Sequence, residues 1–311
     1  MKRVLLTGAG GFIGAQAMAP LLHRGYQVHA VHSRTHVPVN APPEVIWHRA
    51  DLMDQDVVTA LMDRIRPSHL LHFAWYVQPG QFWNSAENFR WVAASLGLLR
   101  AFSANGGRRV VMAGTCAEYD WAGGLLEENS TPLAPRTPYG VCKHALRLLL
   151  DSYAETNELS VAWGRIFFLY GPREYPQRLV ASTIGNLLAG QPALCSEGSQ
   201  RRDFLHVADV AAAFVALLDS SVRGPVNIAS GQPVAIKDLV LQIGDLLGRR
   251  DLIRIGALPS KENEPAELVG AVRRLGDEVG WSPSYSLESG LGETVAWWRA
   301  TGAAGSERRE R

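Results

Sequence analysis

The sequence predicts an α/β fold in which helices cover both faces of a doubly wound parallel sheet, with a smaller C-terminal α/β lobe. Two observations carry this prediction. Strand-like and helix-like segments alternate through the first half of the chain, and the first strand runs directly into a glycine-rich turn and a helix. Because ligands bind beyond the carboxyl ends of the strands in such sheets, we expect the functional residues at that edge.

The glycine-rich turn is the most informative segment. The apolar strand Arg3–Thr7 is followed by Gly8, Gly11 and Gly14 and then by an amphipathic helix. Glycines at this spacing allow a tight turn, a close approach of the backbone to phosphates and close packing of the helix on the strand. The helix N-terminus attracts an anion. The turn therefore predicts a Rossmann-type sheet that binds a dinucleotide.

The remaining elements follow from apolar periodicity. The expected strands of the first half are Arg3–Thr7, Gln27–His32, His69–Phe73, Arg109–Ala113 and Ser160–Ile166, and the expected helices are Phe12–Arg24, Asp54–Arg66, Asn88–Ala104 and Tyr139–Glu155. From Tyr170 onward, shorter elements are expected at Leu179–Ala189, Val207–Leu218, Ile236–Leu247 and Leu287–Arg299 as helices and at Val226–Ile228 as a strand. We assign residues 1–170 to the dinucleotide-binding domain, with later segments returning to it, 171–300 mainly to a substrate-binding lobe, and 301–311 to a disordered tail.

Composition and charge argue against several classes of protein. The chain of 311 residues has a formal net charge of +1, so it lacks the excess of positive charge that is typical of nucleic-acid-binding proteins. No apolar run is long enough to span a bilayer. Its three cysteines, Cys116, Cys142 and Cys195, are far apart, and its nine histidines form no cluster with metal-ligand spacing. We expect a cytoplasmic protein with no bound metal, no nucleic-acid partner and no membrane contact.

A tyrosine and a lysine carry the expected chemistry. Tyr139 and Lys143 lie four residues apart in an expected helix, so their side chains share one face. A tyrosine ionises near pH ~10, and a neighbouring lysine cation favours the phenolate and lowers that pKa. Thr115 follows the strand Arg109–Ala113, where its hydroxyl can hydrogen-bond a substrate oxygen and the tyrosine. Together with the glycine turn, these residues indicate an acid–base site beside a dinucleotide.

These residues resemble the extended short-chain dehydrogenase/reductase family, in its nucleotide-sugar epimerase, dehydratase and reductase branch. The resemblance covers roughly residues 1–300, and its most specific segments are Thr7–Gly14, Tyr139–Lys143, Arg165–Pro172 and Arg201–Val210. It implies that Tyr139 is the acid/base, that Lys143 binds the nicotinamide ribose and tunes Tyr139, and that Thr115 orients the substrate oxygen.

The resemblance also implies a set of binding residues. His72-Phe73-Ala74 is similar to the family's strand end beneath the cofactor, and Asp51-Leu52 to its pair beside adenine. The expected cofactor contacts are Gly8, Gly11, Phe12, Ile13, Gly14, His32, Ser33, Arg34, Asp51, Leu52, Phe73, Ala74 and Lys143. The expected substrate contacts are Thr115, Cys116, Tyr139, Phe168, Arg178 and Arg202. Arg202 matches the family arginine that contacts the nucleotide diphosphate.

The end of the second expected strand bears on the choice of cofactor. NAD enzymes of this type place a carboxylate there for the ribose hydroxyls, whereas this chain has His32, Ser33 and Arg34. A carboxylate would repel a 2′-phosphate, while serine and arginine can bind one. We therefore expect NADP(H) in preference to NAD(H), with a solvated Arg34 as the alternative interpretation.

The residues after Thr115 separate the possible reactions. Dehydratases of the family carry an acidic residue one or two positions later, where this chain has Cys116 and Ala117. Glu118 stands one position too far, and in an extended strand end it would point to the other face. The string from Gly114 to Tyr119 resembles 4-keto-6-deoxyhexose reductases, so we expect NADPH-dependent reduction of a nucleotide-linked 4-keto-6-deoxysugar. A 4-epimerase with tightly bound NAD(P) and a non-catalytic dinucleotide sensor remain open.

Departures from the family pattern leave the substrate open. Phe168 replaces an asparagine that often contacts the nucleotide sugar, and Glu267 and Ala271 stand where an arginine and an aspartate are often found. Arg173, Arg178 or Arg201 could supply a lost diphosphate contact. The other interpretation is a substrate that lacks a nucleotide diphosphate.

Two helices are apolar over a wide arc and point to self-association. Asn88–Ala104 and Tyr139–Glu155 each carry apolar side chains on more than one face. One face can pack on the sheet, and the other needs a second partner. We expect a homodimer through these helices, with cover by the second lobe as the alternative.

Overall fold

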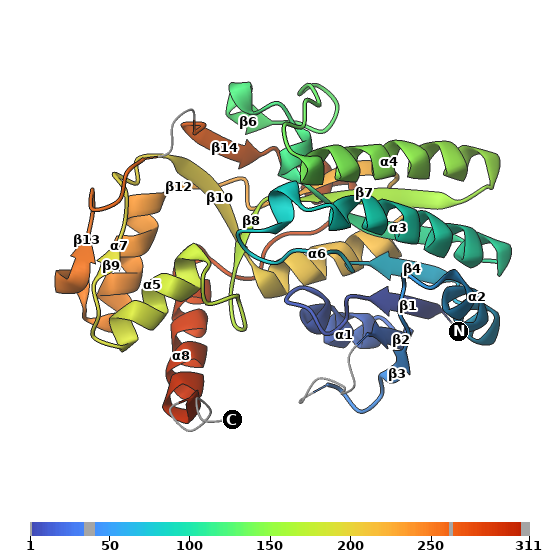
Figure 1. The fold of residues 1–311 in the computed structure, drawn as a ribbon, viewed down its shortest axis with the longest axis horizontal. Helices are drawn as coiled ribbons and strands as arrows, with labels where there is room; N and C mark the ends of the chain where they lie inside the picture. Colours follow the sequence, from blue (N-terminus) through green and yellow to red (C-terminus); the bar gives the residue numbers. More distant parts are fainter. Residues whose placement is uncertain (1, 34–40, 261–263, 306–311) are drawn as a thin grey trace.

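The computed structural model describes residues 2–33, 41–260 and 264–305, with side chains described as far as Thr301. A seven-stranded, wholly parallel sheet has helices on both faces, and shorter strands with three helices form a second lobe at one end (Figure 1). The large sheet has the strand order β11-β7-β5-β4-β1-β2-β3. This confirms the expected Rossmann-like α/β fold.

The sheet strands are short apolar runs between helices, as expected for a parallel sheet buried on both faces. They are β1 (Arg3–Thr7), β2 (Gln27–His32), β3 (Ile46–Arg49), β4 (His69–His72), β5 (Arg109–Thr115), β7 (Ser160–Ile166) and β11 (Gly224–Ile228). The helices that cover it are α1 (Gly14–His23), α2 (Gln55–Ile65), α3 (Glu87–Ala104), α4 (Pro138–Thr156) and α6 (Val207–Asp219). Helices α1 and α6 pack together on one face, and α2, α3 and α4 form a row on the other (Figure 1).

Local signals explain where these helices begin. The Asp54 side chain accepts hydrogen bonds from the first backbone N–H groups of α2, at Asp56 and Val57. Thr137 does the same for α4 through Gly140, and Pro138 occupies the first helical position, where a missing N–H costs little. The start of α4 is therefore fixed by its own sequence, one residue before Tyr139.

The second lobe contains the short strands and the remaining helices. Its strands are β6 (Leu125–Leu126), β8 (Phe168–Tyr170), β9 (Ala193–Leu194), β10 (Arg201–His206), β12 (Pro233–Ala235), β13 (Ile253–Arg254) and β14 (Glu267–Gly270). Its helices are α5 (Leu179–Leu188), α7 (Ile236–Leu247) and α8 (Leu287–Gly305). Strand β10 is central: it pairs with β12, β14 and β8.

Two expectations about the second half can be compared with the structure. Later segments were expected to return to the first domain, and α6 and β11 are such segments, since α6 packs on α1 and β11 extends the large sheet beside β7. Apolar side chains of α6 such as Phe214 complete the core of the first sheet. Helix α8 also continues to Gly305 instead of ending at Arg299, so the expected disordered tail from Thr301 begins as helix. Residues 306–311 lie outside the described part.

Candidate active site

The glycine turn is fixed by close backbone contacts. Gly8 has a φ of +66°, and a Cβ at this position would lie 2.8 Å from the Ala74 backbone nitrogen. A Cβ on Gly14 would lie 2.2 Å from the Gly8 carbonyl oxygen, whereas one on Gly11 would meet only that oxygen, at 3.1 Å. Gly8 and Gly14 therefore hold strand and helix together, and they place the turn against Phe73 and Ala74.

The N-terminus of α1 beside this turn carries an uncompensated positive dipole end. Its N-cap, Ile13, makes no side-chain capping hydrogen bond, and the first turn of α1 contains no acidic residue. Unpaired N–H groups at a helix start attract phosphate groups. Gly11, Phe12 and Ile13 lie in the segment between β1 and this helix, so the expected phosphate contacts share one end of α1.

The residues expected near the adenosine half of the cofactor follow β2 and β3. His32 ends β2 and packs edge-on against Trp47, with 5.7 Å between ring centroids, and Ser33 follows it as an exposed residue. Arg34 lies outside the described residues. Asp51 accepts a hydrogen bond from the Met53 backbone nitrogen, which fixes the turn after β3. The side chain of Leu52 is buried in the core.

A neutral histidine fixes the neighbouring strand ends. His72 Nδ1 lies 2.7 Å from Thr7 Oγ1, and His72 Nε2 lies 2.9 Å from Ser95 Oγ on α3. Burial lowers the pKa of His72 to about 3, and the charge of Lys143 adds to this effect. His72 therefore stays neutral at physiological pH and links β1, β4 and α3 beneath the expected cofactor position.

Thr115 and Tyr139 meet at the end of β5. The Thr115 hydroxyl oxygen accepts a hydrogen bond from the Ala117 N–H at 3.2 Å. The expected lowering of the Tyr139 pKa by Lys143 is wrong for the protein alone: burial raises this pKa above its ordinary value, while the hydrogen bond with Thr115 and the charge of Arg178 act in the opposite direction. Tyr139 is thus protonated in the protein alone, as a proton donor must be.

Lys143 lies one helical turn further along α4 and is buried. Its ammonium donates a hydrogen bond to the Ala113 carbonyl at 2.8 Å and lies 3.7 Å from the centroid of the Trp75 indole. Burial lowers the pKa of Lys143 to about 7, and the carboxylate of Glu118 opposes that shift. Tyr139 thus meets Thr115, and Lys143 lies one turn further along the same helix. The contact of Lys143 with Trp75 was not expected from the sequence.

Glu118 is directed away from the site, for a reason other than the expected one. The segment Cys116–Glu118 is a short 3₁₀ helix, not an extended strand end. The fully buried Glu118 carboxylate accepts hydrogen bonds from the Thr115 N–H at 2.9 Å and the Trp163 indole N–H at 2.8 Å, and it pairs with Arg165 at 2.9 Å. Burial also raises the pKa of the Cys116 thiol to about 12. The Cys116 thiol therefore stays protonated near neutral pH, and the Glu118 carboxylate is already engaged by three donors.

Three of the expected substrate residues, Phe168, Arg178 and Arg202, come from the second lobe. The guanidinium of Arg202 on β10 lies 5.7 Å from the ring of Phe168 on β8. That of Arg178, at the start of α5, lies 5.7 Å from the ring of Phe82, which packs edge-on against Tyr139 at 4.8 Å. Arg178 is thereby connected to the Tyr139 site, and Phe168 and Arg202 form a second group.

The cationic groups on β10 are already paired. Arg202 donates to the Glu264 carboxylate at 2.8 Å and to the Pro265 carbonyl at 2.9 Å. Its neighbour Arg201 lies 3.4 Å from the carboxylate of Glu267. Glu264 was missed in the sequence, because nothing local marks it as a partner of Arg202. A substrate diphosphate at Arg202 would compete with Glu264 for the same donors.

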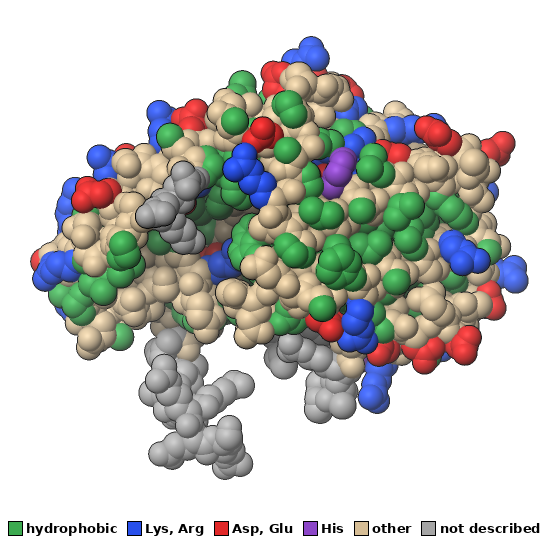
Figure 2. Space-filling model, turned by 45° about the horizontal axis from the view of Figure 1, so that its top comes forward, with side chains coloured by type: hydrophobic (Ala, Val, Ile, Leu, Met, Phe, Trp, Pro, Cys, Tyr) green, Lys and Arg blue, Asp and Glu red, His purple; other side chains and the backbone are tan. Residues whose placement is uncertain are grey.

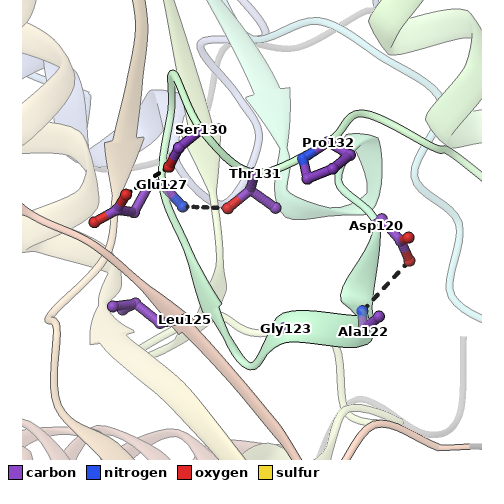
Figure 3. A pocket seen from close by; sticks show the side chains of 8 residues that line it. All are labelled: Asp120, Ala122, Gly123, Leu125, Glu127, Ser130, Thr131 and Pro132. Carbon is purple, nitrogen blue, oxygen red and sulfur yellow. Dashed lines mark hydrogen bonds between the residues drawn. The ribbon is translucent and has the colours of Figure 1, made fainter.

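The segment after Thr115 forms an open hollow outside this site. Figure 3 shows its lining, which comes entirely from the single stretch between Asp120 and Pro132. Hydrogen bonds within that stretch hold its shape, including one from the Glu127 backbone nitrogen to the Thr131 hydroxyl at 2.8 Å. None of the expected cofactor or substrate residues lines the hollow.

The described residues offer neither a metal-binding cluster nor a membrane-spanning helix. Among the described residues, no three His, Cys, Asp or Glu side chains are grouped so that they could hold a metal ion. Within the same ranges, no helix is both long enough and apolar enough to cross a membrane.

The parallel seven-stranded sheet with a glycine turn after β1 defines the class of Rossmann-like α/β proteins. Within this class, the chain belongs to the NAD dependent epimerase/dehydratase family, whose sequence profile matches residues 4–229. The family members it is similar to act on nucleotide sugars, which makes this chain a member of an enzyme family.

Relatives and solved structures cover nearly the whole chain. A dTDP-glucose 4,6-dehydratase from Streptomyces niveus is 29% identical over 96% of this chain and 93% of its own length. The Thermus thermophilus UDP-glucose 4-epimerase, solved with NAD, is 26% identical with a TM-score of 0.83, covering 96% of this chain and 99% of its own. The structure of MoeE5 with UDP-glucuronic acid and NAD is 28% identical with a TM-score of 0.82, covering 97% of this chain and all of its own.

Proposed function

We propose that the protein reduces a keto group, at C4, of a nucleotide-linked 4-keto-6-deoxysugar with NADPH. Thr115 orients the carbonyl oxygen, Tyr139 donates the proton, and Lys143 holds the nicotinamide ribose. The turn fits such a dinucleotide, because Gly8 and Gly14 leave no room for a Cβ and α1 presents an uncapped N-terminus. When bound, the nicotinamide supplies the hydride.

One observation favours this reaction over water elimination. The two positions after Thr115 are the buried thiol of Cys116 and an alanine, and Glu118 is held by Arg165 and Trp163. The site thus offers a tyrosine as its proton donor, while the Glu118 carboxylate at this strand end is already engaged by the Thr115 N–H, Trp163 and Arg165. A single proton transfer at a carbonyl oxygen needs no more than this.

The second candidate is a 4-epimerase, and the solved epimerase similar to this chain favours it. The two reactions differ in what happens to the cofactor. Purified protein should be examined for retained nicotinamide by absorbance and then mixed with NADPH and a dTDP-4-keto-6-deoxyhexose. Stoichiometric NADPH consumption supports the reductase. Retained NAD(P) together with interconversion of the C4 epimers of a UDP-sugar, without net oxidation, would replace it with the epimerase.

We infer a preference for NADP(H) from the end of β2. His32 and Ser33 supply no carboxylate to repel a 2′-phosphate, although the structures of two similar proteins contain NAD. We expect kcat/KM to be at least about tenfold higher with NADPH than with NADH, and a Ser33→Asp variant to reverse the order by charge repulsion. Equal kcat/KM values for the two cofactors in the unaltered enzyme would contradict this inference.

We propose that the second lobe, mainly within residues 171–300, supplies most of the substrate contacts. Arg178 and Arg202 are the cations expected to meet the nucleotide diphosphate, and Cys116 and Phe168 the groups that line the sugar side. The Glu264 carboxylate forms an ion pair with Arg202 in the free protein. Binding of a diphosphate at Arg202 would therefore replace one ion pair by another.

A homodimer through α3 and α4 is also part of the proposal. Figure 2 shows hydrophobic side chains gathered on the side that carries these helices, and Phe89, Val141, Leu148 and Leu149 are exposed there. Sedimentation should give twice the chain mass of 34.0 kDa. The double variant Leu148→Glu/Leu149→Glu should sediment as a monomer, because it places two charges in the proposed interface. A monomeric wild-type protein at micromolar concentration excludes the dimer.

A further inference from the structure

The ammonium of Lys143 lies against an aromatic ring that the proposed reaction does not use. Its Nζ atom lies 3.7 Å from the centroid of the Trp75 indole, whereas the ring of Trp163 is more distant at 5.9 Å. Both Lys143 and Trp75 are more than nine-tenths buried, with 4% and 8% of their surfaces exposed. The cation therefore exchanges most of its water for one carbonyl and one indole face.

The orientation of this indole is fixed by a buried asparagine. Trp75 Nε1 donates to Asn88 Oδ1 at 2.9 Å, and Asn88 Nδ2 donates to the carbonyls of Phe82 at 2.7 Å and Ser85 at 2.9 Å. Asn88 is fully buried at the start of α3. Because the amide is engaged on both sides, the ring of Trp75 is held face-on to Lys143.

The same anchor reaches the tyrosine. The rings of Phe82 and Trp83 stand edge-on to Tyr139, with centroid distances of 4.8 and 5.6 Å. Asn88 thus joins the segment that packs against Tyr139 to the ring that faces Lys143. The two expected catalytic side chains share one support, formed by Trp75, Phe82 and Asn88.

We propose that Trp75, held by Asn88, is a positioning residue that keeps the Lys143 ammonium charged and directed toward the cofactor site. The inference rests on the proposed role of Lys143, but the contact itself does not depend on which sugar is reduced. The face of an indole attracts a cation, and the attraction is greatest where water is excluded.

The other groups that face Lys143 give its ammonium charge limited stabilisation. Burial lowers the pKa of Lys143 to about 7, and the Glu118 carboxylate raises it. That carboxylate is shared with Arg165, and His72 is neutral because burial lowers its pKa to about 3. The indole thus adds a stabilising contact to a cation that burial disfavours. Loss of the ring should make Lys143 lose its proton at lower pH.

Direct titration of Lys143 tests the inference without turnover. The chain contains only four lysines, Lys2, Lys143, Lys237 and Lys261, so ¹³Cε-labelled lysine gives few signals, and Lys143→Met assigns the one of interest. We expect Trp75→Leu to lower the titration midpoint of Lys143 by about one pH unit. Trp75→Phe should give a smaller shift in the same direction, because benzene attracts cations less than indole.

Trp91 offers a matched control. Its ring lies 6.2 Å from that of Trp75 in the same hydrophobic cluster, so Trp91→Leu should leave the Lys143 midpoint unchanged. If Trp75→Leu does not fold, as judged by circular dichroism, Trp75→Phe decides the matter. An unchanged or raised midpoint in the folded variants overturns the inference.

Kinetics then separate this inference from the proposed function. With an active substrate, the alkaline limb of the kcat profile should move to lower pH in Trp75→Leu by the same amount as the NMR midpoint, and Trp75→Phe should restore most of the loss. If no keto sugar is reduced but the midpoint still moves, the proposed function fails and the positioning role stands. A general loss of kcat with both midpoint and limb unmoved shows a merely structural role.

Discussion

Replacing Tyr139 with phenylalanine is expected to lower kcat about a thousandfold while the KM for the cofactor changes little. The variant removes the hydroxyl that meets Thr115, and a positioned proton donor contributes roughly two to four orders of magnitude to a rate. The ring itself stays, so its edge-on packing with Phe82 at 4.8 Å is preserved. The measurement is steady-state reduction of the keto sugar followed by NADPH absorbance.

Tyr153 on the same helix provides the control for this substitution. It packs at the edge of the core beneath α4, so Tyr153→Phe should keep full activity. If Tyr139→Phe turns over the true substrate at the wild-type rate, the acid–base role is wrong. If the protein is a non-catalytic dinucleotide sensor, which is the remaining alternative, neither the wild-type protein nor the Tyr139→Phe variant should turn over the substrate.

Replacing Arg165 with leucine should lower the free energy of unfolding by about 3–5 kcal/mol, since it leaves a buried carboxylate without its partner. Glu118 and Arg165 have no exposed side-chain surface, and Arg165 also donates to the Tyr119 hydroxyl at 2.9 Å. Urea unfolding followed by circular dichroism measures the loss, and the slope of the transition shows whether the folded state is otherwise unchanged.

The ion pair of Arg147 with Asp151 on α4 is the matched comparison. Its two charges lie 3.0 Å apart but remain partly exposed, and such pairs contribute about 0–1 kcal/mol. Arg147→Leu should therefore change the unfolding free energy far less than Arg165→Leu. Equal losses of unfolding free energy in the two variants would show that the buried ion pair stabilises the fold no more than the partly exposed one.

Periodicity and turn chemistry were enough to predict most of the large sheet. Strands β1, β2 and β7 have the bounds expected from the sequence, because each is an apolar run between clear helical segments. Strand β3 was missed, since Ile46–Arg49 mixes aromatic and charged residues at the sheet edge. Strand β10 was recognised only as a charged motif. Its buried Asp203 accepts hydrogen bonds from the backbone N–H groups of Ser230 and Gly231, which are remote in sequence, so no local pattern marks this residue as part of a buried strand.

In the site, too, local pattern predicts some residues and misses those whose partners are remote in sequence. Spacing on one helix was enough to place Tyr139 and Lys143 together, and a strand end to place Thr115. The partners Glu118 and Arg165 lie 47 positions apart, and the contact of Trp75 with Lys143 joins two different strand–helix units. Local pattern carries no information about such pairs, which depend on the order of strands in the sheet.

Because β11 and α6 return to the first sheet, the two lobes are not separable modules. A chain cut at Tyr170 would lose β11, which covers the free edge of β7 along five paired residues. It would also lose the apolar face of α6 that lies over α1. An uncovered parallel strand edge invites intermolecular pairing. The N-terminal segment on its own would aggregate, and exchange of substrate lobes between relatives would require at least three junctions in the chain.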